Sequence, residues 1–194
     1  MRTVAIFIFP EVETLDFCGP LEAFSAANLA TGEDYFRVLT FAEGLSPVRS
    51  VNGLSVNPDY DLDSVPRPDI LVIPGGSGSR RVAEDAGALA AIGRLGAASE
   101  YAFSVCSGAR IPAALGWLDG KPFTTHHLVF DDVRKLAPTA RPMPDRRFVD
   151  NGSVLTSAGV AAGIDLSLYL IAKIHGRGLA ERTARYMEYP LLDL

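Results

Sequence analysis

A cysteine at the end of a mostly apolar run is the strongest chemical signal in this sequence. Cys106 follows residues 101–105 directly, and the small residues Ser107 and Gly108 come next. A strand that turns sharply into a helix needs small neighbours, because its backbone is strained and the central side chain must stand clear. The pattern therefore predicts a nucleophile elbow. At a helix N-terminus, free amides and the helix dipole favour the thiolate, so we expect a reactive Cys106 with a lowered pKa, not a buried structural thiol.

Two other apolar runs are followed by residues that complement a thiol. Asp16 comes shortly after the run at 3–9, and the glycine-rich stretch at 75–78 follows the run at 70–73. In an open parallel sheet the carboxyl ends of the strands meet at one edge, so an acid, backbone donors and a nucleophile should converge there. The glycine-rich stretch lacks a P-loop lysine and carries Arg81 where a dinucleotide fingerprint has its third glycine. We expect the amides of Gly76 and Ser107 to form an oxyanion loop.

Some candidate residues have an ordinary structural explanation as well as a functional one. Asp16 is either a helix N-cap or a catalytic acid, and the two roles are compatible. His126 and His127 are adjacent, so at most one of them faces the site, and no chelating spacing accompanies them. Cys18 has no Cys-x-x-Cys partner, so we expect it to pack and not to form a redox pair with Cys106. We expect neither a metal nor a cofactor.

The positions of apolar runs and breakers predict an α/β fold. Strands are expected at 3–9, 36–41, 70–73, 102–105 and 154–156, and helices at 16–28, 84–98, 108–115, 128–136, 159–175 and 179–187. Pro20 would lie in the first turn of the first helix, and Asn52-Gly53 indicates a two-residue hairpin. Residues 137–150 are expected to be an irregular surface excursion. Alternating strands and helices of this kind build a mostly parallel sheet covered on both faces.

Composition narrows the class of protein further. A length of 194 residues suits a single domain over 1–194, and 48% hydrophobic with 21% charged residues excludes general disorder. A formal charge of −5 without a basic cluster argues against nucleic acid and anionic membranes as partners. The N-terminal apolar run lacks a cleavage site and reads as a strand, and no run is long enough to span a bilayer. Two cysteines make no disulfide framework, so we expect a cytoplasmic protein.

Six ordered blocks of the sequence resemble the ThiJ/PfpI superfamily, whose fold is class I glutamine amidotransferase-like. They are FP at 9–10 with LDFCGP at 15–20, IPGG at 73–76, SVCSGA at 104–109, TTH at 124–126 and TSAGVAAGID at 156–165. The resemblance reaches nearly the whole chain. It implies a flavodoxin-like three-layer sandwich, and it adds Cys18, His126, Gly159 and Val160 as candidates for the wall of the pocket.

Within that superfamily the chain resembles the branch that holds isocyanide hydratases and the sensor-like domains of AraC-type regulators. The protease-like branch has a histidine directly after the cysteine, whereas this chain has Ser107, so peptidase activity is not expected. Isocyanide hydratases share the Leu-Asp before a Gly-Pro pair but carry threonine at the positions of Cys18 and Ser107. The regulators append a helix-turn-helix domain beyond the position of Pro190, and since none follows here, direct control of DNA is not expected.

The resemblance implies hydration of an isocyanide to an N-substituted formamide. Cys106 would attack the terminal carbon, Asp16 would carry the proton, and the partner would be a small electrophilic substrate or ligand. Two alternatives stay open: a ligand-sensing or redox-responsive protein without turnover, and a glyoxalase- or deglycase-like enzyme that acts on reactive carbonyls. Relatives of this type are homodimers, so a homodimer is expected here.

Overall fold

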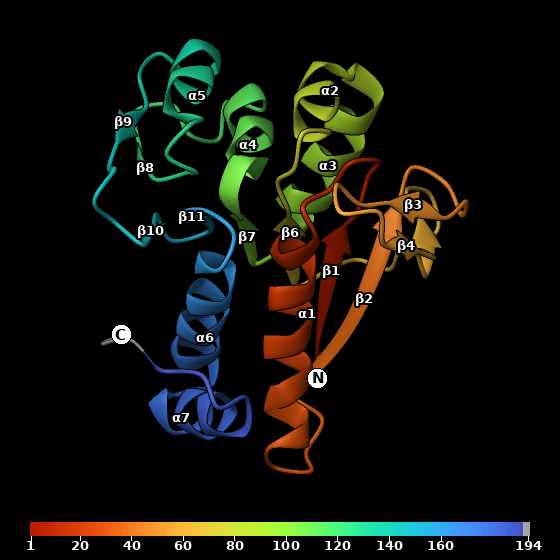
Figure 1. The fold of residues 1–194 in the computed structure, drawn as a ribbon, viewed down its shortest axis with the longest axis vertical. Coiled ribbons are helices and arrows are strands. Elements are labelled where there is room, and N and C mark those ends of the chain that lie inside the picture. The colour runs from red at the N-terminus through yellow and green to blue at the C-terminus, as the bar shows by residue number, and fades with distance from the viewer. Residues whose placement is uncertain (192–194) are drawn as a thin grey trace.

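A seven-stranded sheet forms the centre of the computed structural model, which describes residues 1–191 (Figure 1). The strand order is β10-β11-β7-β6-β1-β2-β5. The bounds are β1 Arg2–Phe7, β2 Phe36–Ala42, β5 Tyr60–Asp61, β6 Ile70–Ile73, β7 Tyr101–Ser104, β10 Phe148–Asp150 and β11 Val154–Ser157. All neighbouring strands are parallel except β10 and β11, which are antiparallel. This confirms the mostly parallel sheet and the flavodoxin-like fold expected from the sequence.

The interior strands are nearly continuous apolar runs, as expected for strands covered on both faces. β6 is buried along its whole length, and it pairs with β1 from Val4↔Ile70 onward. β1 also pairs with β2, from Arg2↔Phe36 to Phe7↔Phe41. The chain thus leaves β1 toward one side of the sheet and leaves β6 toward the other. A crevice for a ligand opens at the carboxyl ends of strands where the strand order reverses in this way. The fold therefore predicts a ligand site beyond the carboxyl ends of β1 and β6.

Crossovers that run in both directions along the sheet distribute the helices over its two faces, since such connections are almost always right-handed. The chain passes from β1 to β2 through α1 and from β6 to β7 through α2 and α3 in opposite directions across the sheet, so these helices lie on opposite faces. On the α1 face, α1 (Thr14–Leu29), α6 (Ala162–His175) and α7 (Arg177–Tyr186) contact one another. On the other face, α2 (Ser79–Glu84) contacts both α3 (Ala86–Ala98) and α4 (Arg110–Ala114), and α4 contacts α5 (Phe130–Leu136).

Short strands complete the fold and correct two expectations in part. β3 (Val48–Arg49) and β4 (Ser55–Val56) pair antiparallel around Asn52-Gly53, so the predicted hairpin is present, but its loop has three residues, 51–53, and not two, because Ser50 and Leu54 still pair. The stretch 137–150, expected to be irregular, contains β9 (Arg141–Pro142), which pairs with β8 (Pro122–Phe123), and the edge strand β10. The expectation was wrong for these two short strands, because pairing with β8 and β11, not local propensity, orders them. Residues 143–147 between them are irregular and mostly exposed, as expected.

Two details of the predicted helices were also wrong. The helix expected at 84–98 is two helices, separated at Asp85, whose carboxylate caps α3 by accepting bonds from the amides of Gly87 and Ala88 at 2.8 and 2.9 Å. α1 begins at Thr14, so Pro20 lies inside the helix and not in its first turn. Its missing N–H leaves the carbonyl of Asp16 without a helical partner. Within residues 1–191, no helix is both long enough and apolar enough to cross a membrane.

Candidate active site

Cys106 stands on a strained turn between β7 and a short helical segment, η1 (Cys106–Ala109), which leads into α4. Val105 is still extended, whereas Cys106 has a φ of 57°, a left-handed conformation that costs a non-glycine residue about 1–2 kcal/mol. Gly108 has no room for a side chain, because a Cβ there would lie 2.3 Å from the carbonyl oxygen of Ile73. The predicted sharp, strained turn from strand to helix at Cys106 is therefore confirmed.

Asp16 is the third residue of α1 and is completely buried. The N-cap position belongs to Glu13, so the alternative that Asp16 caps the helix was wrong. Asp16 Oδ2 accepts a hydrogen bond from the amide of Gly75 at 2.8 Å. Its other oxygen, Oδ1, is buried without a hydrogen-bond partner among the described residues. A buried carboxylate oxygen without a partner is costly to keep charged, and it is free to take up a proton.

The two acidic groups of the site hold their protons more tightly than usual. Burial raises the pKa of Asp16 to about 7; the nearby Glu13 charge adds to this, and the Gly75 amide opposes it. Burial and the Asp16 charge raise the pKa of the Cys106 thiol to about 12. The expected lowering of the thiol pKa was therefore wrong for the free protein, because desolvation and a neighbouring carboxylate outweigh the helix terminus. At neutral pH any negative charge of the pair resides mainly on Asp16.

Backbone amides surround the sulfur, but one of those expected is already engaged. Gly76 donates its N–H to Ser107 Oγ at 2.8 Å. The amides of Val160 and Ser107 instead interact with the Cys106 sulfur, and both lower the pKa of its thiol. Val160, like Cys106, has a positive φ, here 45°. Donors for negative charge at the sulfur thus come from the elbow and from the turn before α6.

A cavity of about 350 Å³ opens in front of Cys106. Cys106, Ser107, Gly76 and Val160 line it together with His126, and the remaining lining residues are Glu13, Ser77, Arg80, Arg110, Leu128 and Val129. The elbow, the glycine-rich loop, the N-terminal end of α1 and the segment before α5 each supply part of its wall. The space suits a small molecule.

His126 faces this cavity, which answers a question that the sequence left open. Burial and the neighbouring His127 ring, at 4.3 Å between centroids, lower the pKa of His126, with a smaller contribution from Arg110. The lowered pKa favours a neutral imidazole at neutral pH, which would not stabilise a Cys106 thiolate by charge. Gly159 makes room for this ring, because a Cβ there would lie 2.6 Å from His126 Cδ2.

Cys18 does not belong to the wall of this cavity as far as residues 1–191 describe it. Its half-buried side chain packs against the main hydrophobic core, as expected. Burial raises the pKa of its thiol, and the charge of Glu22 raises it further. In the same part of the chain, no three His, Cys, Asp or Glu side chains gather as a metal site would require.

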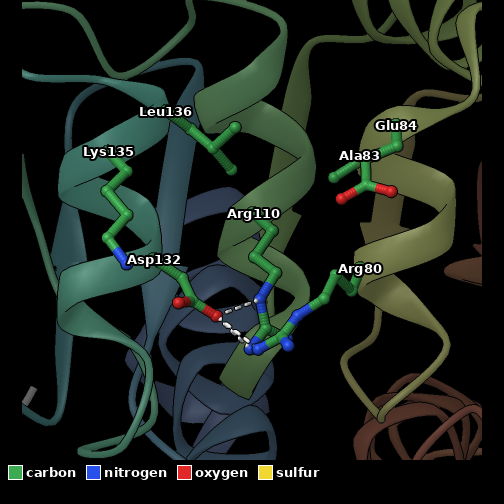
Figure 2. A pocket seen from close by; sticks show the side chains of 7 residues that line it. All are labelled: Arg80, Ala83, Glu84, Arg110, Asp132, Lys135 and Leu136. Atoms are coloured by element: carbon green, nitrogen blue, oxygen red, sulfur yellow. Dashed lines mark hydrogen bonds and ion pairs between the residues drawn. The ribbon is translucent and has the colours of Figure 1, made fainter.

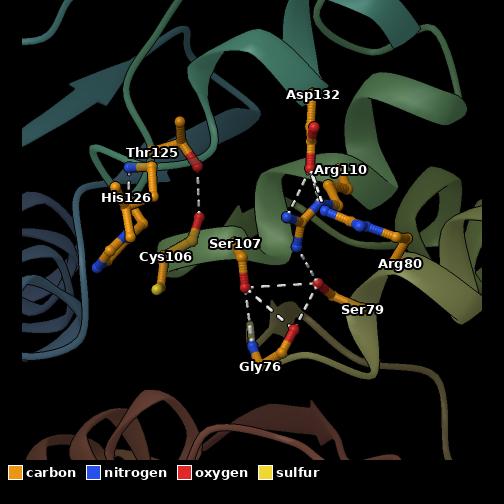
Figure 3. A network of polar contacts seen from close by, with 10 residues as sticks. Gly76, Ser79, Arg80, Cys106, Ser107, Arg110, Thr125, His126 and Asp132 are labelled. Carbon is orange, nitrogen blue, oxygen red and sulfur yellow. Dashed lines mark hydrogen bonds and ion pairs between the residues drawn. The ribbon is translucent and has the colours of Figure 1, made fainter.

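The wall formed by Arg80 and Arg110 is shared with a second, smaller cavity of about 170 Å³ (Figure 2). This cavity lies among α2, α4 and α5 and is also lined by Ala83, Glu84, Asp132, Lys135 and Leu136. From the arginine wall a network of polar contacts leads through Ser79 to Gly76 and Ser107, beside Cys106 (Figure 3).

Comparison with known proteins identifies the family. The DJ-1/PfpI family pattern matches residues 2–173. The chain belongs to the DJ-1/PfpI family. Isonitrile hydratase of Pseudomonas putida is 33% identical to it over 187 residues, which cover 96% of this chain and 78% of the hydratase. The crystal structure of a ThiJ/PfpI family protein from Pseudomonas syringae superposes with a TM-score of 0.88 at 30% identity and covers 99% of this chain and 76% of that one.

Members of the DJ-1/PfpI family with a regulatory name are also similar to this chain. The transcriptional regulator GbdR of Pseudomonas aeruginosa is 26% identical over 190 residues, which cover 97% of this chain. The chain spans only 51% of the length of that regulator. The family and its fold are thus common to a protein named as an enzyme and to proteins named as regulators, so the site residues must carry any functional argument.

Arg110, Ser79 and Asp132 are parts of this DJ-1/PfpI site that the sequence did not single out. Arg110 is only 7% exposed although it lies in an otherwise apolar helical stretch. A charge at such a position is rarely buried without a partner. That conflict is a signal in the sequence, but it does not identify the partner, since Asp132 lies on a different helix.

Proposed function

We propose that this DJ-1/PfpI protein hydrates small isocyanides to N-substituted formamides, with Cys106 as nucleophile and Asp16 as proton carrier. The observation that carries the proposal is the buried, unpartnered Oδ1 of Asp16 beside the Cys106 thiol. An isocyanide must receive a nucleophile and a proton on the same terminal carbon. A thiol and a carboxyl group that hold one mobile proton between them supply both.

The first half of the reaction forms a thioimidate. As the sulfur of Cys106 bonds to the terminal carbon, the Asp16 carboxylate accepts the thiol proton, and the protonated Asp16 then delivers it to that carbon. The amides of Ser107 and Val160 stabilise negative charge on the sulfur while the proton is in transit. Such donors are worth about 3 kcal/mol each in acyl-transfer sites.

The second half consumes one water molecule and restores the thiol. Asp16 takes a proton from water as the hydroxyl oxygen bonds to the thioimidate carbon, and this proton passes to the substrate nitrogen. The carbon–sulfur bond then breaks as the hydroxyl becomes the formamide carbonyl, and the released proton returns to Cys106. Two proton transfers in each direction need a carrier that is acid and base at the same pH. A pKa of about 7 for Asp16 meets that need.

A redox-sensing role is the less favoured alternative. Oxidation by peroxide proceeds through the thiolate, so sensor cysteines have a low pKa. Burial and the Asp16 charge work against the thiolate of Cys106. The homodimer, the cytoplasmic location and the absence of a nucleic-acid partner, expected from the sequence, stay predictions.

The test is steady-state formation of a formamide from a simple alkyl isocyanide, compared among the unmodified protein, Cys106→Ala and Asp16→Asn. We expect many turnovers for the unmodified protein, none for Cys106→Ala, and a loss of about 10²- to 10⁴-fold for Asp16→Asn, the range for a general acid–base group. Cys18→Ser serves as the control thiol substitution and should be fully active. Absence of product above the buffer rate would overturn the proposal.

A further inference from the structure

A buried guanidinium joins three of the elements that surround the reaction cavity. Arg110 lies four residues after Cys106 and donates from Nε and Nη2 to Asp132 Oδ2 at 3.0 and 2.7 Å (Figure 2). Arg80 Nη2 donates to the same oxygen at 2.8 Å. One carboxylate on α5 therefore holds an arginine from α4 and another from α2. The arrangement fixes the Arg110 side chain, because a buried charge without its partner is strongly unfavourable.

The remaining nitrogen of Arg110 determines the direction of a hydroxyl proton. Nη1 donates to Ser79 Oγ at 2.9 Å. A guanidinium has only donors, so Ser79 must accept from it and turn its own proton elsewhere. Ser79 Oγ donates that proton to the carbonyl oxygen of Gly76 at 2.8 Å (Figure 3). The same carbonyl also accepts from the amide of Ser79 and from Ser107 Oγ, each at 3.2 Å, so the bond that Arg110 orients is the shortest of three that anchor the loop after β6.

The anchored loop leads directly to the proton carrier. Gly76 donates its N–H to Ser107 Oγ, and the preceding residue, Gly75, donates its N–H to Asp16 Oδ2 at 2.8 Å. The contact is close, because a Cβ on Gly75 would lie 2.5 Å from Ser107 Oγ and 2.7 Å from Asp16 Oδ2. A small shift of this loop would therefore weaken the bond from Gly75, which favours the charged form of Asp16.

We propose that Arg110 is a positioning residue, which acts through Ser79 and the Gly75–Gly76 loop to keep Asp16 able to accept the proton of Cys106. The inference rests on the proposed function for its turnover measurement. Three neighbours affect the pKa of Asp16. They are Glu13, which precedes it on the chain, Cys106 on the turn after β7, and the amide of Gly75 on the loop after β6. Arg110 is connected through Ser79 to the loop that carries the third of these.

The decisive variants are Arg110→Leu, which removes the contact with Ser79, and Arg110→Lys, which keeps a positive donor. For Arg110→Leu we expect kcat to fall by about 10- to 100-fold, the cost of a displacement near 1 Å, while KM for a small neutral isocyanide changes by less than about threefold. The acid limb of the pH profile should move to higher pH, because a weaker bond from Gly75 lets the pKa of Asp16 rise. Arg110→Lys should recover part of kcat and of the shift.

A second readout does not need turnover. The rate at which iodoacetamide alkylates Cys106 follows the first proton lost by the Asp16–Cys106 pair, so its midpoint should also move to higher pH in Arg110→Leu. If no isocyanide is hydrated but this midpoint moves, the proposed function fails and the positioning role stands. An unmoved midpoint in a folded Arg110→Leu would overturn the positioning role whatever the turnover.

Ser79→Ala and Lys173→Met complete the experiment. Ser79→Ala removes one hydroxyl and keeps the Arg110–Asp132 ion pair, so it tests the same route should Arg110→Leu not fold, and it should show the same shift. Lys173→Met removes the ion pair with Asp150 at the end of α6 and should leave both readouts unchanged. An unshifted Ser79→Ala, or equal shifts in Ser79→Ala and Lys173→Met, would also refute the inference.

Discussion

Replacement of Asp16 by asparagine should stabilise the folded protein at alkaline pH and much less so at acidic pH. The pKa of Asp16 is raised from its ordinary 3.8 to about 7, so the folded state holds this proton more tightly than the unfolded state does. As pH rises from 3.8 toward 7, the unfolded state loses the proton first, and the folded state is progressively disfavoured. One pKa unit corresponds to about 1.4 kcal/mol, so the full cost above pH 7 is on the order of 4 kcal/mol.

The assay is urea unfolding of the unmodified protein and of Asp16→Asn at pH 4.5 and pH 8. At each pH, the free energy of unfolding of the unmodified protein is subtracted from that of Asp16→Asn, and the two differences are then compared. Effects of the amide that do not depend on pH cancel in this comparison. We expect Asp16→Asn to gain a few kcal/mol relative to the unmodified protein between pH 4.5 and pH 8.

Asp150→Asn is the matched control for that comparison. Burial raises the pKa of Asp150, but bonds from Lys173 and Tyr169 outweigh it and the net shift is downward. Its contribution to stability is therefore present above its ordinary pKa of 3.8 and is lost only as pH falls below that value, so it should be nearly constant between pH 4.5 and pH 8. If the stability difference for Asp16→Asn were equally constant, the argument for a raised pKa at Asp16 would be refuted.

Two more predictions concern the thiol and the glycine-rich loop. In the unmodified protein the rate of Cys106 alkylation should level off above about pH 7. In Asp16→Asn the rate should keep rising by about tenfold per pH unit toward the pKa of an uncoupled thiol. A profile without a plateau in the unmodified protein would contradict the coupling of the two groups. Gly76→Ala should lower the free energy of unfolding by more than about 2 kcal/mol, because Gly76 has a φ of 118° and a Cβ there would lie 2.2 Å from the carbonyl oxygen of Glu11. Gly120→Ala, with a φ of 69° and open space around it, should cost only about 1 kcal/mol in the same measurement, and equal losses would refute the steric argument.

The core strands could be predicted from the sequence because their pattern is local. β6 was predicted with the bounds that it has, since Ile70–Ile73 is an apolar run enclosed by Asp69 and Pro74. α2 was missed because it is six residues long and begins just after a glycine-rich stretch, where turn signals dominate. β10 was missed because an edge strand of three half-buried residues depends on its partner β11 and not on a local pattern.

The candidate site divides in the same way between local and tertiary information. Cys106 and Asp16 could be predicted because each follows a strand at the edge where parallel strands end. Their pKa values could not, since the dominant cause is burial by segments far apart in the sequence. The pairing of Arg110 with Asp132 is equally non-local, because the two residues are 22 positions apart on different helices.

The raised pKa values of the pair favour an acid–base shuttle over a stable thiolate. In the proposed hydration, a proton leaves the sulfur and one is delivered to carbon, so a thiolate that is fully formed beforehand would bring no gain, because its proton would already be lost to solvent. Burial of Asp16 and Cys106 keeps that proton within the pair, and the bond from Gly75 to Asp16, with a smaller contribution from Cys106, prevents the carboxyl from becoming too weak an acid to release it. The pKa of Asp16 thus depends on a bond whose geometry is set by the loop at Gly75. Residues that hold this loop, such as Arg110 and Ser79, should therefore affect the pH dependence of the reaction more than the affinity for substrate.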